Sequence, residues 1–572
     1  MVMLVSPRRL ALLAAALLAG CAAGGAPDAA APDTPRAESS RPPRPNAAGA
    51  YLAGRFATAE TDTAAAADQL LEALRLAPDE PEVLNRAFIA SVLDGRPEAV
   101  RLARRLPQSE LAQMLLAGSD AMAGRWEQAE RRLRNLPRSG AAALLQPLLL
   151  AWAQAGRGDT DGALATLQPL IQGGRLRGLA SLHAALIADL ANRPAEAERL
   201  ARQSLAESPE ANLRMIQAIA GILERAGKSA EAAQLIEALA SVGDEYSLIG
   251  APEARRRLLQ NRAVASPVEG MAEAELALAG ALRGQGAPEL SLLLARLALR
   301  LRPDSTPALL VAADSLNDEK HPESALALLR NVPEEDPLSG IVALRRATLL
   351  DRVNRTEEAI AVLRRLGERY PSSVQPPARL GDLLRSRERY AEAVEAYTEA
   401  LSRVGRPEAT PWALFYVRGI ALERSGQWPR AEADFQRALQ LSPEQPYVLN
   451  YLGYSWVEHG TNLAEARRML ERAMELRPQD GNIADSLGWA LYKLGDLPGA
   501  IRWLERAAEL ESRNSVINDH LGDAYWAAGR RIEAQYQWRR ALTLEPEPGE
   551  APKIAAKLRD GLPEPVPAAA RP

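Results

Sequence analysis

A glycine or alanine returns about every 34 residues through the second half of this 572-residue chain. A period of this length means that one small unit is repeated and that each copy buries its apolar face against its neighbours. Arrays of this kind usually present a curved binding surface. The period therefore predicts stacked pairs of helices. The lead residues, separated by 34, 34, 34, 38, 34, 35 and 34 positions, are Ala279, Ala313, Ala347, Gly381, Gly419, Gly453, Gly488 and Gly522.

Four further positions recur with the lead residue. About 12 residues after it comes a second small residue, and a third follows seven positions later. A bulky side chain lies between these two, and a proline often closes the unit. The paired small residues are Ala393 and Ala400, Ala431 and Ala438, Ala466 and Ala473, Ala500 and Ala507, and Ala534 and Ala541. The bulky residues are Tyr397, Phe435, Leu470, Leu504 and Trp538.

Residues 482–511 show how one unit folds. An apolar stripe at helical spacing predicts a first helix. Gly495 ends this helix, because glycine adopts the left-handed conformation, and Asp496 and Pro498 suit the start of a second one. Small residues let the two helices approach closely, and we expect the bulky residue to fill the space between one pair and the next. The first stripe consists of Ile483, Leu487, Leu491 and Leu494.

Taken together, these positions resemble the tetratricopeptide repeat (TPR). The resemblance implies an all-α fold, a TPR-type α-solenoid forming a right-handed superhelix of about 14 antiparallel helix pairs. Ser291 and Ser512 depart from the pattern, since an alanine and a proline are expected there. The best-preserved unit contains Leu487, Gly488, Ala500, Leu504 and Ala507.

Weaker copies occupy the first half, which gives six units before the eight of the second half. We expect a degenerate array over residues 51–240 and a regular array over residues 271–546. Residues 241–270 break the period and are expected to hold an irregular helix pair and a loop around Ser266-Pro267. Residues 547–572 are expected to form a capping helix and a Pro-rich tail. The lead residues of the first half are Gly54, Ala87, Ala117, Ala151, Ala185 and Ala220.

The N-terminus has the features of an export signal. Arg8 and Arg9 precede an apolar run over residues 10–18, which is too short for a permanent membrane span. The sequence Leu18-Ala19-Gly20-Cys21 resembles the bacterial lipobox, and Cys21 is the only cysteine in the chain. We therefore expect residues 1–20 to be a lipoprotein signal peptide and Cys21 to carry the lipid.

A flexible tether is expected over residues 21–50, because prolines lie there among Ala, Gly, Ser and Asp. Ala22 and Ala23 follow the cysteine where an aspartate would favour retention at the inner membrane. By resemblance to the lipoproteins of Gram-negative bacteria, the chain is expected at the outer membrane, facing the periplasm, and in contact with the membrane through its lipid anchor only.

Composition argues against several functions. The formal net charge is −4 with acidic and basic residues interspersed, which is unlike a nucleic-acid-binding protein. His183, His321, His459 and His520 lack the spacing of metal ligands, and we expect them at the surface or in a groove. No nucleophile has a base nearby, and the repeats leave no room for a catalytic domain. We expect no enzyme activity, cofactor or metal.

Aromatic residues concentrate near the C-terminus, where residues 412–541 hold seven of the nine tryptophans and seven of the twelve tyrosines. In a TPR array the first helix of each pair lines the concave side. Its aromatic rings would give apolar contacts to an extended peptide, and Asn and Asp would meet the peptide backbone or basic side chains. The alternative is that part of this set packs against neighbouring helices. The candidate groove residues are Tyr416, Asn450, Tyr454, Asp485, Trp489, Tyr492, Asp519, Asp523 and Trp526.

The segments 449–454, 484–489 and 520–522 resemble large, lipid-anchored, periplasmic TPR proteins of Gram-negative bacteria. One member type is an adaptor that tethers a carboxyl-terminal processing protease and delivers peptidoglycan hydrolases to it. The resemblance implies a non-catalytic scaffold that binds envelope proteins or peptides. The more specific hypothesis is that its partners are that protease and those hydrolases. The alternatives are an assembly factor for a pilus, secretin or outer-membrane complex, and the substrate-binding arm of an enzyme.

Overall fold

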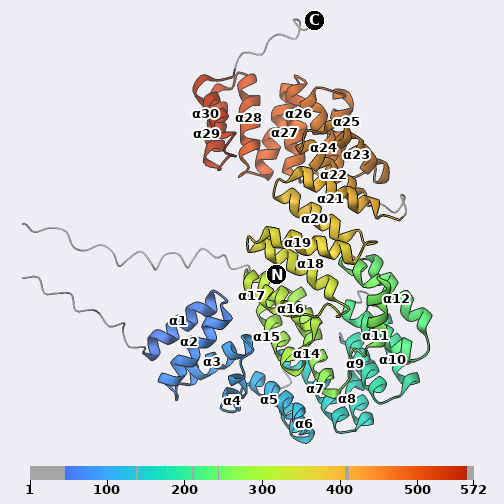
Figure 1. The fold of residues 1–572 in the computed structure, drawn as a ribbon. Coiled ribbons are helices and arrows are strands. Elements are labelled where there is room, and N and C mark those ends of the chain that lie inside the picture. The colour runs from blue at the N-terminus through green and yellow to red at the C-terminus, as the bar shows by residue number, and fades with distance from the viewer. Residues whose placement is uncertain are drawn as a thin grey trace, which may run out of the picture.

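The computed structural model describes residues 46–136, 140–173, 176–208, 212–242, 244–405 and 411–562. Within these ranges the chain forms thirty α-helices and one 3-10 helix, η1, and no strand. Cys21, the expected signal peptide, most of the expected tether and the Pro-rich tail lie outside the described residues. Figure 1 shows the helices stacked in pairs along a curved path.

The front array is the run of six helix pairs that precedes the break in the repeat. Its helices are α1 (Ala47–Ala59), α2 (Thr63–Leu76), α3 (Pro81–Leu93), α4 (Glu98–Ala103), α5 (Glu110–Met122), α6 (Trp126–Arg134), α7 (Gly140–Gly156), α8 (Thr160–Gln172), α9 (Arg177–Leu190), α10 (Pro194–Ala206), α11 (Leu213–Arg225) and α12 (Ser229–Val242).

After the break, made of η1 (Asp244–Gly250) and α13 (Pro252–Gln260), come eight more pairs and a final single helix. The first four pairs are α14 (Pro267–Gly284) with α15 (Pro288–Leu301), α16 (Thr306–Asp318) with α17 (Pro322–Leu328), α18 (Ser339–Arg352) with α19 (Thr356–Arg369), and α20 (Gln375–Ser386) with α21 (Tyr390–Ser402). The remaining helices are α22 (Trp412–Arg424), α23 (Trp428–Leu441), α24 (Pro446–His459), α25 (Leu463–Leu476), α26 (Gly481–Lys493), α27 (Leu497–Leu510), α28 (Ser515–Ala527), α29 (Arg531–Thr543) and α30 (Ala551–Asp560).

The expected all-α solenoid of 14 helix pairs is confirmed, with six pairs before the break and eight after it in the described ranges. Every lead residue lies on the first helix of its pair, the A helix. A helices of successive units contact one another, as α24 contacts α26 and α26 contacts α28. Because the inner side of a curved array is the more crowded one, these contacts place the A helices on the concave side.

In the units whose lead residue is glycine, that residue is small because the bulky residue of the second helix, the B helix, packs directly on it. A Cβ atom at Gly488 would lie 2.7 Å from Leu504 Cγ, and one at Gly522 would lie 2.5 Å from Trp538 Cδ1. The expectation that the bulky residue fills the space between successive pairs is therefore corrected, since its main contact is within its own pair. Phe435 makes both contacts, because its ring also lies 5.0 Å from that of Tyr451 in the next unit.

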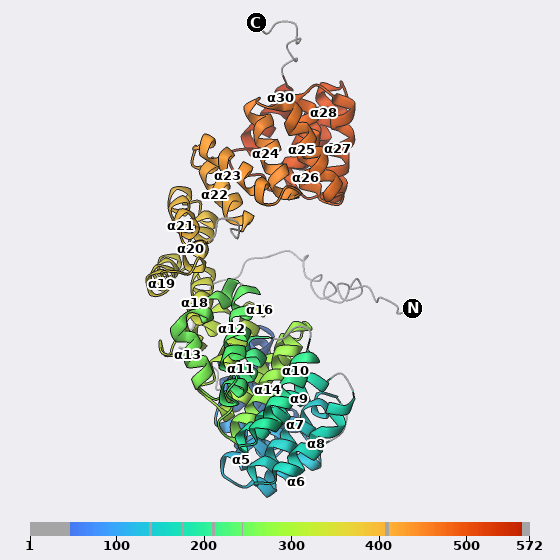
Figure 2. The ribbon, with the colours of Figure 1, turned by 90° about the vertical axis from the view of Figure 1, so that its right-hand side faces the viewer.

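The concave side of the front array is filled by the chain itself. Helices α14 and α15, which we call the inserted hairpin, contact α3, α5, α7 and α9. Figures 1 and 2 show them lying against the curve of the front array. Gly270 lies where a Cβ atom would clash with the Trp152 indole, and Arg214 binds Glu273 through bonds of 2.6–3.0 Å. The repeat period did not predict this insertion.

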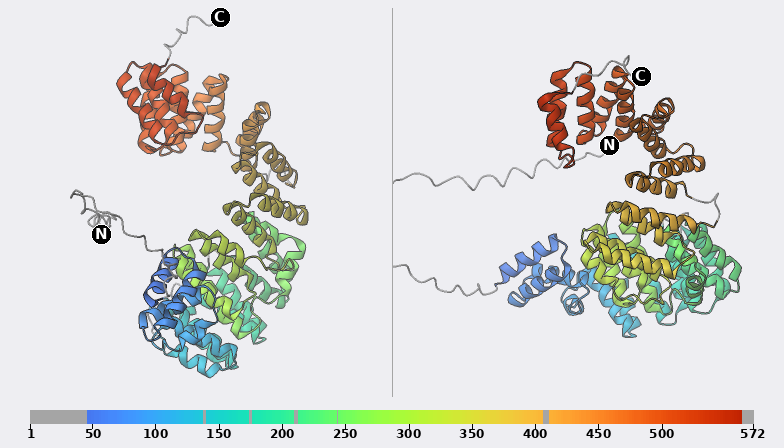
Figure 3. Two further views of the ribbon diagram at one scale, coloured as in Figure 1. Left: turned by 60° about the vertical axis from the view of Figure 1, so that its left-hand side comes forward. Right: turned by 45° about the horizontal axis from the view of Figure 1, so that its top comes forward.

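The front array and the inserted hairpin together form what we call the front lobe. The back array, helices α20–α29, leads away from it beyond α18 and α19 (Figure 3). The last helix, α30, covers its C-terminal end and lies within residues 547–572, where a capping helix is expected. Solenoid ends require such a cap, because the last repeat has no neighbour to bury its apolar face.

Two expected boundaries move. Helix α1 begins at Ala47, inside the segment expected as tether, because Asn46 caps it by accepting a 2.6 Å hydrogen bond from the Gly49 amide. Ser266 caps α14 in the same way and Pro267 lies in its first turn, so this dipeptide starts a helix instead of forming the expected loop.

His183 is also corrected, because it lies in the core and not at a surface or groove. It is fully buried on α9, and Trp152 Nε1 donates a 2.9 Å hydrogen bond to its Nδ1. Burial lowers the pKa of His183 to about 4. Protonation of Nδ1 would also break the bond from Trp152, so the imidazole is neutral in the folded chain.

The close packing at the lead glycines predicts that adding a single methyl group there lowers the stability of the helix pair. Gly488→Ala should destabilise α26 and α27 by about 1–3 kcal/mol, because the new Cβ overpacks against Leu504. Gly280→Ala is the control, since nothing lies within 4 Å of its Cβ position, and a gain of up to about 1 kcal/mol is expected there. Amide hydrogen exchange of each helix measures both effects, and equal protection in the two variants would contradict the packing.

The neutral His183 predicts acid sensitivity of the front lobe. Between pH 6.5 and about 4 the unfolded chain binds a proton that the folded chain does not, so the free energy of unfolding should fall by about 1.4 kcal/mol per pH unit from this group. His183→Gln retains an acceptor for Trp152 and should remove this slope. Denaturant unfolding across this pH range compares the two proteins, and parallel curves would contradict the burial argument.

Candidate protein-binding groove

The nine candidate groove residues lie on the A helices α22, α24, α26 and α28 of the back array, as the repeat register predicts. Asp485 and Asp523 are buried, and the other seven are partly exposed. No candidate is fully exposed, because adjacent A helices contact one another along the concave side.

Tyr416 contributes mainly to packing. Its ring lies 6.2 Å from that of Phe435 and 6.0 Å from that of Tyr451, the second contact being edge-to-face. Tyr451 in turn donates a 3.1 Å hydrogen bond to Glu423. Burial raises the pKa of Tyr416 above its ordinary value. This tyrosine therefore joins α22 to α24 at the edge of the groove.

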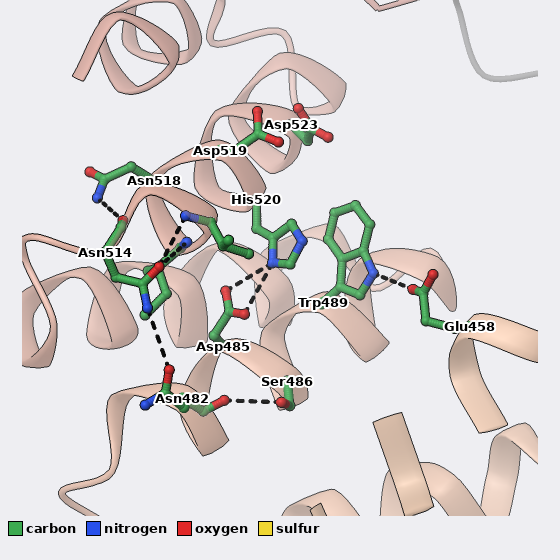
Figure 4. A network of polar contacts seen from close by, with 12 residues as sticks. Glu458, Asn482, Asp485, Ser486, Trp489, Asn514, Asn518, Asp519, His520 and Asp523 are labelled. Atoms are coloured by element: carbon green, nitrogen blue, oxygen red, sulfur yellow. Dashed lines mark hydrogen bonds and ion pairs between the residues drawn. The ribbon is translucent and has the colours of Figure 1, made fainter. Parts of the chain in front are cut away.

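Trp489 is the centre of the candidate site (Figure 4). Its indole stacks on the ring of His520 at 4.0 Å and on that of Tyr492 at 5.0 Å, with interplanar angles of 14° and 17°. Its Nε1 donates a 2.6 Å hydrogen bond to Glu458, and the ammonium of Lys493 lies 4.9 Å from its ring centre. These contacts fix the orientation of the indole, which limits the entropy lost on binding a ligand.

His520 and Asp485 join α28 to α26. The imidazole Nδ1 lies 3.0 and 3.1 Å from the two carboxylate oxygens. Burial alone would lower the pKa of His520, but Asp485, assisted by Asp519 and Asp523, raises it above its ordinary value. The protonated imidazole so favoured lies against the electron-rich face of Trp489, which is an attractive arrangement.

Asn450 and Tyr454 lie one helical turn apart on α24. The Asn450 Oδ1 atom is buried and has no hydrogen-bond donor among the described residues. A buried acceptor without a partner has a free-energy cost, which a hydrogen bond from a ligand that reaches it would remove. Burial raises the pKa of Tyr454 well above its ordinary value, so the phenol is neutral.

The C-terminal end of the groove is covered by the chain itself. Lys557 on α30 lies 2.8 Å from both Asp519 and Asp523. Trp526 donates a 3.1 Å hydrogen bond to the Leu562 carbonyl, and the guanidinium of Arg531 lies 3.9 Å from its ring centre. These three candidates therefore contact the C-terminal segment. The five candidates between Tyr416 and these three, here called the central strip, are Asn450, Tyr454, Asp485, Trp489 and Tyr492, of which Asp485 is buried and the other four are partly exposed.

Sequence reasoning missed the two charged residues that flank Trp489. Glu458 and Lys493 each lie five positions after a lead glycine, Gly453 and Gly488 respectively. That shared offset was the available signal, because it places both side chains on the same face of successive A helices. Across the described ranges, no helix is both long and apolar enough to span a membrane, and no group of three or more His, Cys, Asp or Glu side chains is arranged to hold a metal ion.

Comparison with known proteins identifies the repeat. Residues 342–373 match one tetratricopeptide repeat model, and residues 378–446, 416–462 and 460–514 match another. An 87-residue segment is 33% identical to the TPR repeat-containing protein PA4667 of Pseudomonas aeruginosa. That segment spans 15% of this chain and 15% of the relative.

Two solved structures are similar in fold. YrrB, described as a TPR protein with an unusual peptide-binding site, is 21% identical, with a TM-score of 0.27 over 34% of this chain and 97% of YrrB. The APC/C hetero-tetramer Cut9–Hcn1 is 15% identical, with a TM-score of 0.37 over 90% of this chain and 96% of the other. The family models therefore place tetratricopeptide repeats at residues 342–373 and 378–514 of this chain, within the α-solenoid of helix pairs described above.

Proposed function

We propose that this chain is a non-catalytic scaffold that binds segments of partner proteins along the central strip. The observation that carries the proposal is the difference between the two arrays. The inserted hairpin fills the concave side of the front array, whereas among the described residues α22, α24 and α26 have extensive contacts only with helices of the back array. TPR arrays characteristically bind peptides or proteins on that side.

The chemistry of the central strip suits an extended peptide. Tyr454 and Trp489 offer partly exposed rings for apolar contact, and rigid aromatic side chains are frequent centres of binding energy. Asn450 offers an acceptor for a backbone N–H group. Glu458, which is exposed beside Trp489, would attract a Lys or Arg side chain of the ligand.

The finer form of the proposal places the scaffold at the outer membrane, anchored by a lipid on Cys21 and facing the periplasm. Its partners would be a carboxyl-terminal processing protease and the peptidoglycan hydrolases that the protease degrades. The sequence resemblance of the segments 449–454, 484–489 and 520–522 supports this role.

Partner capture tests the groove. Trp489→Ala combined with Tyr454→Ala should lower the recovery of crosslinked partners from envelope extracts by at least about tenfold, as expected when aromatic anchors are removed. Tyr536→Ala is the control, because this tyrosine is 62% exposed on the B helix α29. Circular dichroism would verify that both proteins remain folded.

The outcomes separate the candidate roles. Recovery of a processing protease together with wall hydrolases supports the adaptor. Recovery of secretin or pilus subunits alone would favour an assembly factor instead. Unchanged capture by the double variant would mean that partners bind elsewhere on the chain.

Lipid attachment is tested by Cys21→Ser. Without the thiol no acyl chain can be attached, so the protein should move from the membrane fraction to the soluble fraction and lose incorporation of labelled palmitate. Ala22→Asp is the matched variant, since it should keep the label but shift the protein to the inner membrane. Retention of Cys21→Ser in the outer-membrane fraction would contradict the lipid anchor.

A further inference from the structure

A pocket of about 360 Å³ lies between the front array and the inserted hairpin. On one side it is lined by α3, α4 and α5, and on the other by α15, α16 and α17. Three arginines line it, namely Arg96 from the α3–α4 turn, and Arg296 and Arg300 from α15. Its volume lies within the range of small-molecule sites. The apolar part of the lining includes Val92, Leu115, Leu297, Leu299, Leu309 and Leu328.

Two of these arginines have no partner. Among the described residues, neither Arg296 nor Arg300 forms a hydrogen bond or an ion pair, and the Nε atoms of both are buried without an acceptor. By contrast, Arg96 pairs with Asp94 and Asp68. Asp94, whose charge acts on Arg296, also accepts a hydrogen bond from Thr63.

Leaving two guanidinium groups in this state is unfavourable. Burial lowers the pKa of Arg296, although Asp94 partly opposes the effect, and burial also lowers the pKa of Arg300. Arginine nevertheless stays protonated in proteins, so the cost appears as unfavourable desolvation and as repulsion between like charges one helical turn apart. An anion between the two groups would offset both costs.

We propose that this pocket binds the carboxylate or phosphate group of a small molecule through Arg296 and Arg300. Guanidinium groups bind both anions with paired, charge-assisted hydrogen bonds. The leucines around the pocket accommodate an apolar part of the same ligand. Because the pocket is lined by α3 as well as α15, a ligand that fills it contacts both the front array and the inserted hairpin. This site is separate from the central strip and does not depend on the proposed function.

Calorimetric titration of the full chain, purified in detergent, tests the site. Inorganic phosphate and succinate are titrated separately at constant ionic strength set with chloride, and at least one should bind saturably. A preference for phosphate or for succinate identifies the chemistry of the natural ligand. Absence of saturable binding by both anions would overturn the proposal.

Substitutions locate the binding. Arg296→Gln combined with Arg300→Gln should abolish it, and Arg300→Gln alone should weaken it by about tenfold or more, as for other bonds to charged groups. The single variant keeps the test valid if the double variant fails to fold, which circular dichroism would reveal. Arg104→Gln, at an exposed arginine outside the pocket, should bind as the natural chain does. Equal affinity in all variants would overturn the assignment.

Discussion

The close contact between the two helices of each pair determines the rest of this structure. It requires a residue with little or no side chain on the A helix and a large side chain on the B helix, as at Gly488 and Leu504 or Gly522 and Trp538. Because a small lead residue recurs on the A helix of every unit, the pairs stack in a similar way and the A helices form one continuous inner surface. The function of the chain then depends on what occupies that surface.

The inner surface is covered by different parts of the chain in the two arrays. In the front array the inserted hairpin occupies the inner surface, and it carries polar groups into the interior. Glu273 binds Arg214 there, while Glu275 is buried and burial raises its pKa well above the ordinary value. Buried ionisable groups add little net stability, but they are strongly unfavourable when misplaced, so they help to fix one position of the hairpin. In the described part of the back array, α30 covers the C-terminal end.

The sequence predicted the helix pairs and the register of the A helices because both depend on contacts between neighbours, which repeat along the chain. It did not predict the insertion, since the contact of Gly270 with Trp152 joins residues far apart and occurs once. The burial of His183 was missed for the same reason, because its environment includes the hairpin. Asp519, Asp523 and Trp526 were assigned to a groove by an offset that every repeat shares, but only the last repeat is covered by a cap.

Asn450, Asp485 and Asp519 each lie three positions before a lead glycine, but they differ in whether the next helix supplies a hydrogen-bond donor. Asp485 receives the imidazole of His520 from the next A helix, and Asp519 receives the ammonium of Lys557 from α30. His520 lies two positions before its lead residue, Gly522. The corresponding residue before Gly488 is Ser486, whose hydroxyl donates instead to the Asn482 carbonyl of its own helix. Asn450 therefore receives no donor from α26, and its buried oxygen has no hydrogen-bond partner among the described residues. A ligand N–H group gains most at a buried acceptor that the protein itself leaves unpaired, which makes this point of the central strip the most favourable place for a partner's backbone.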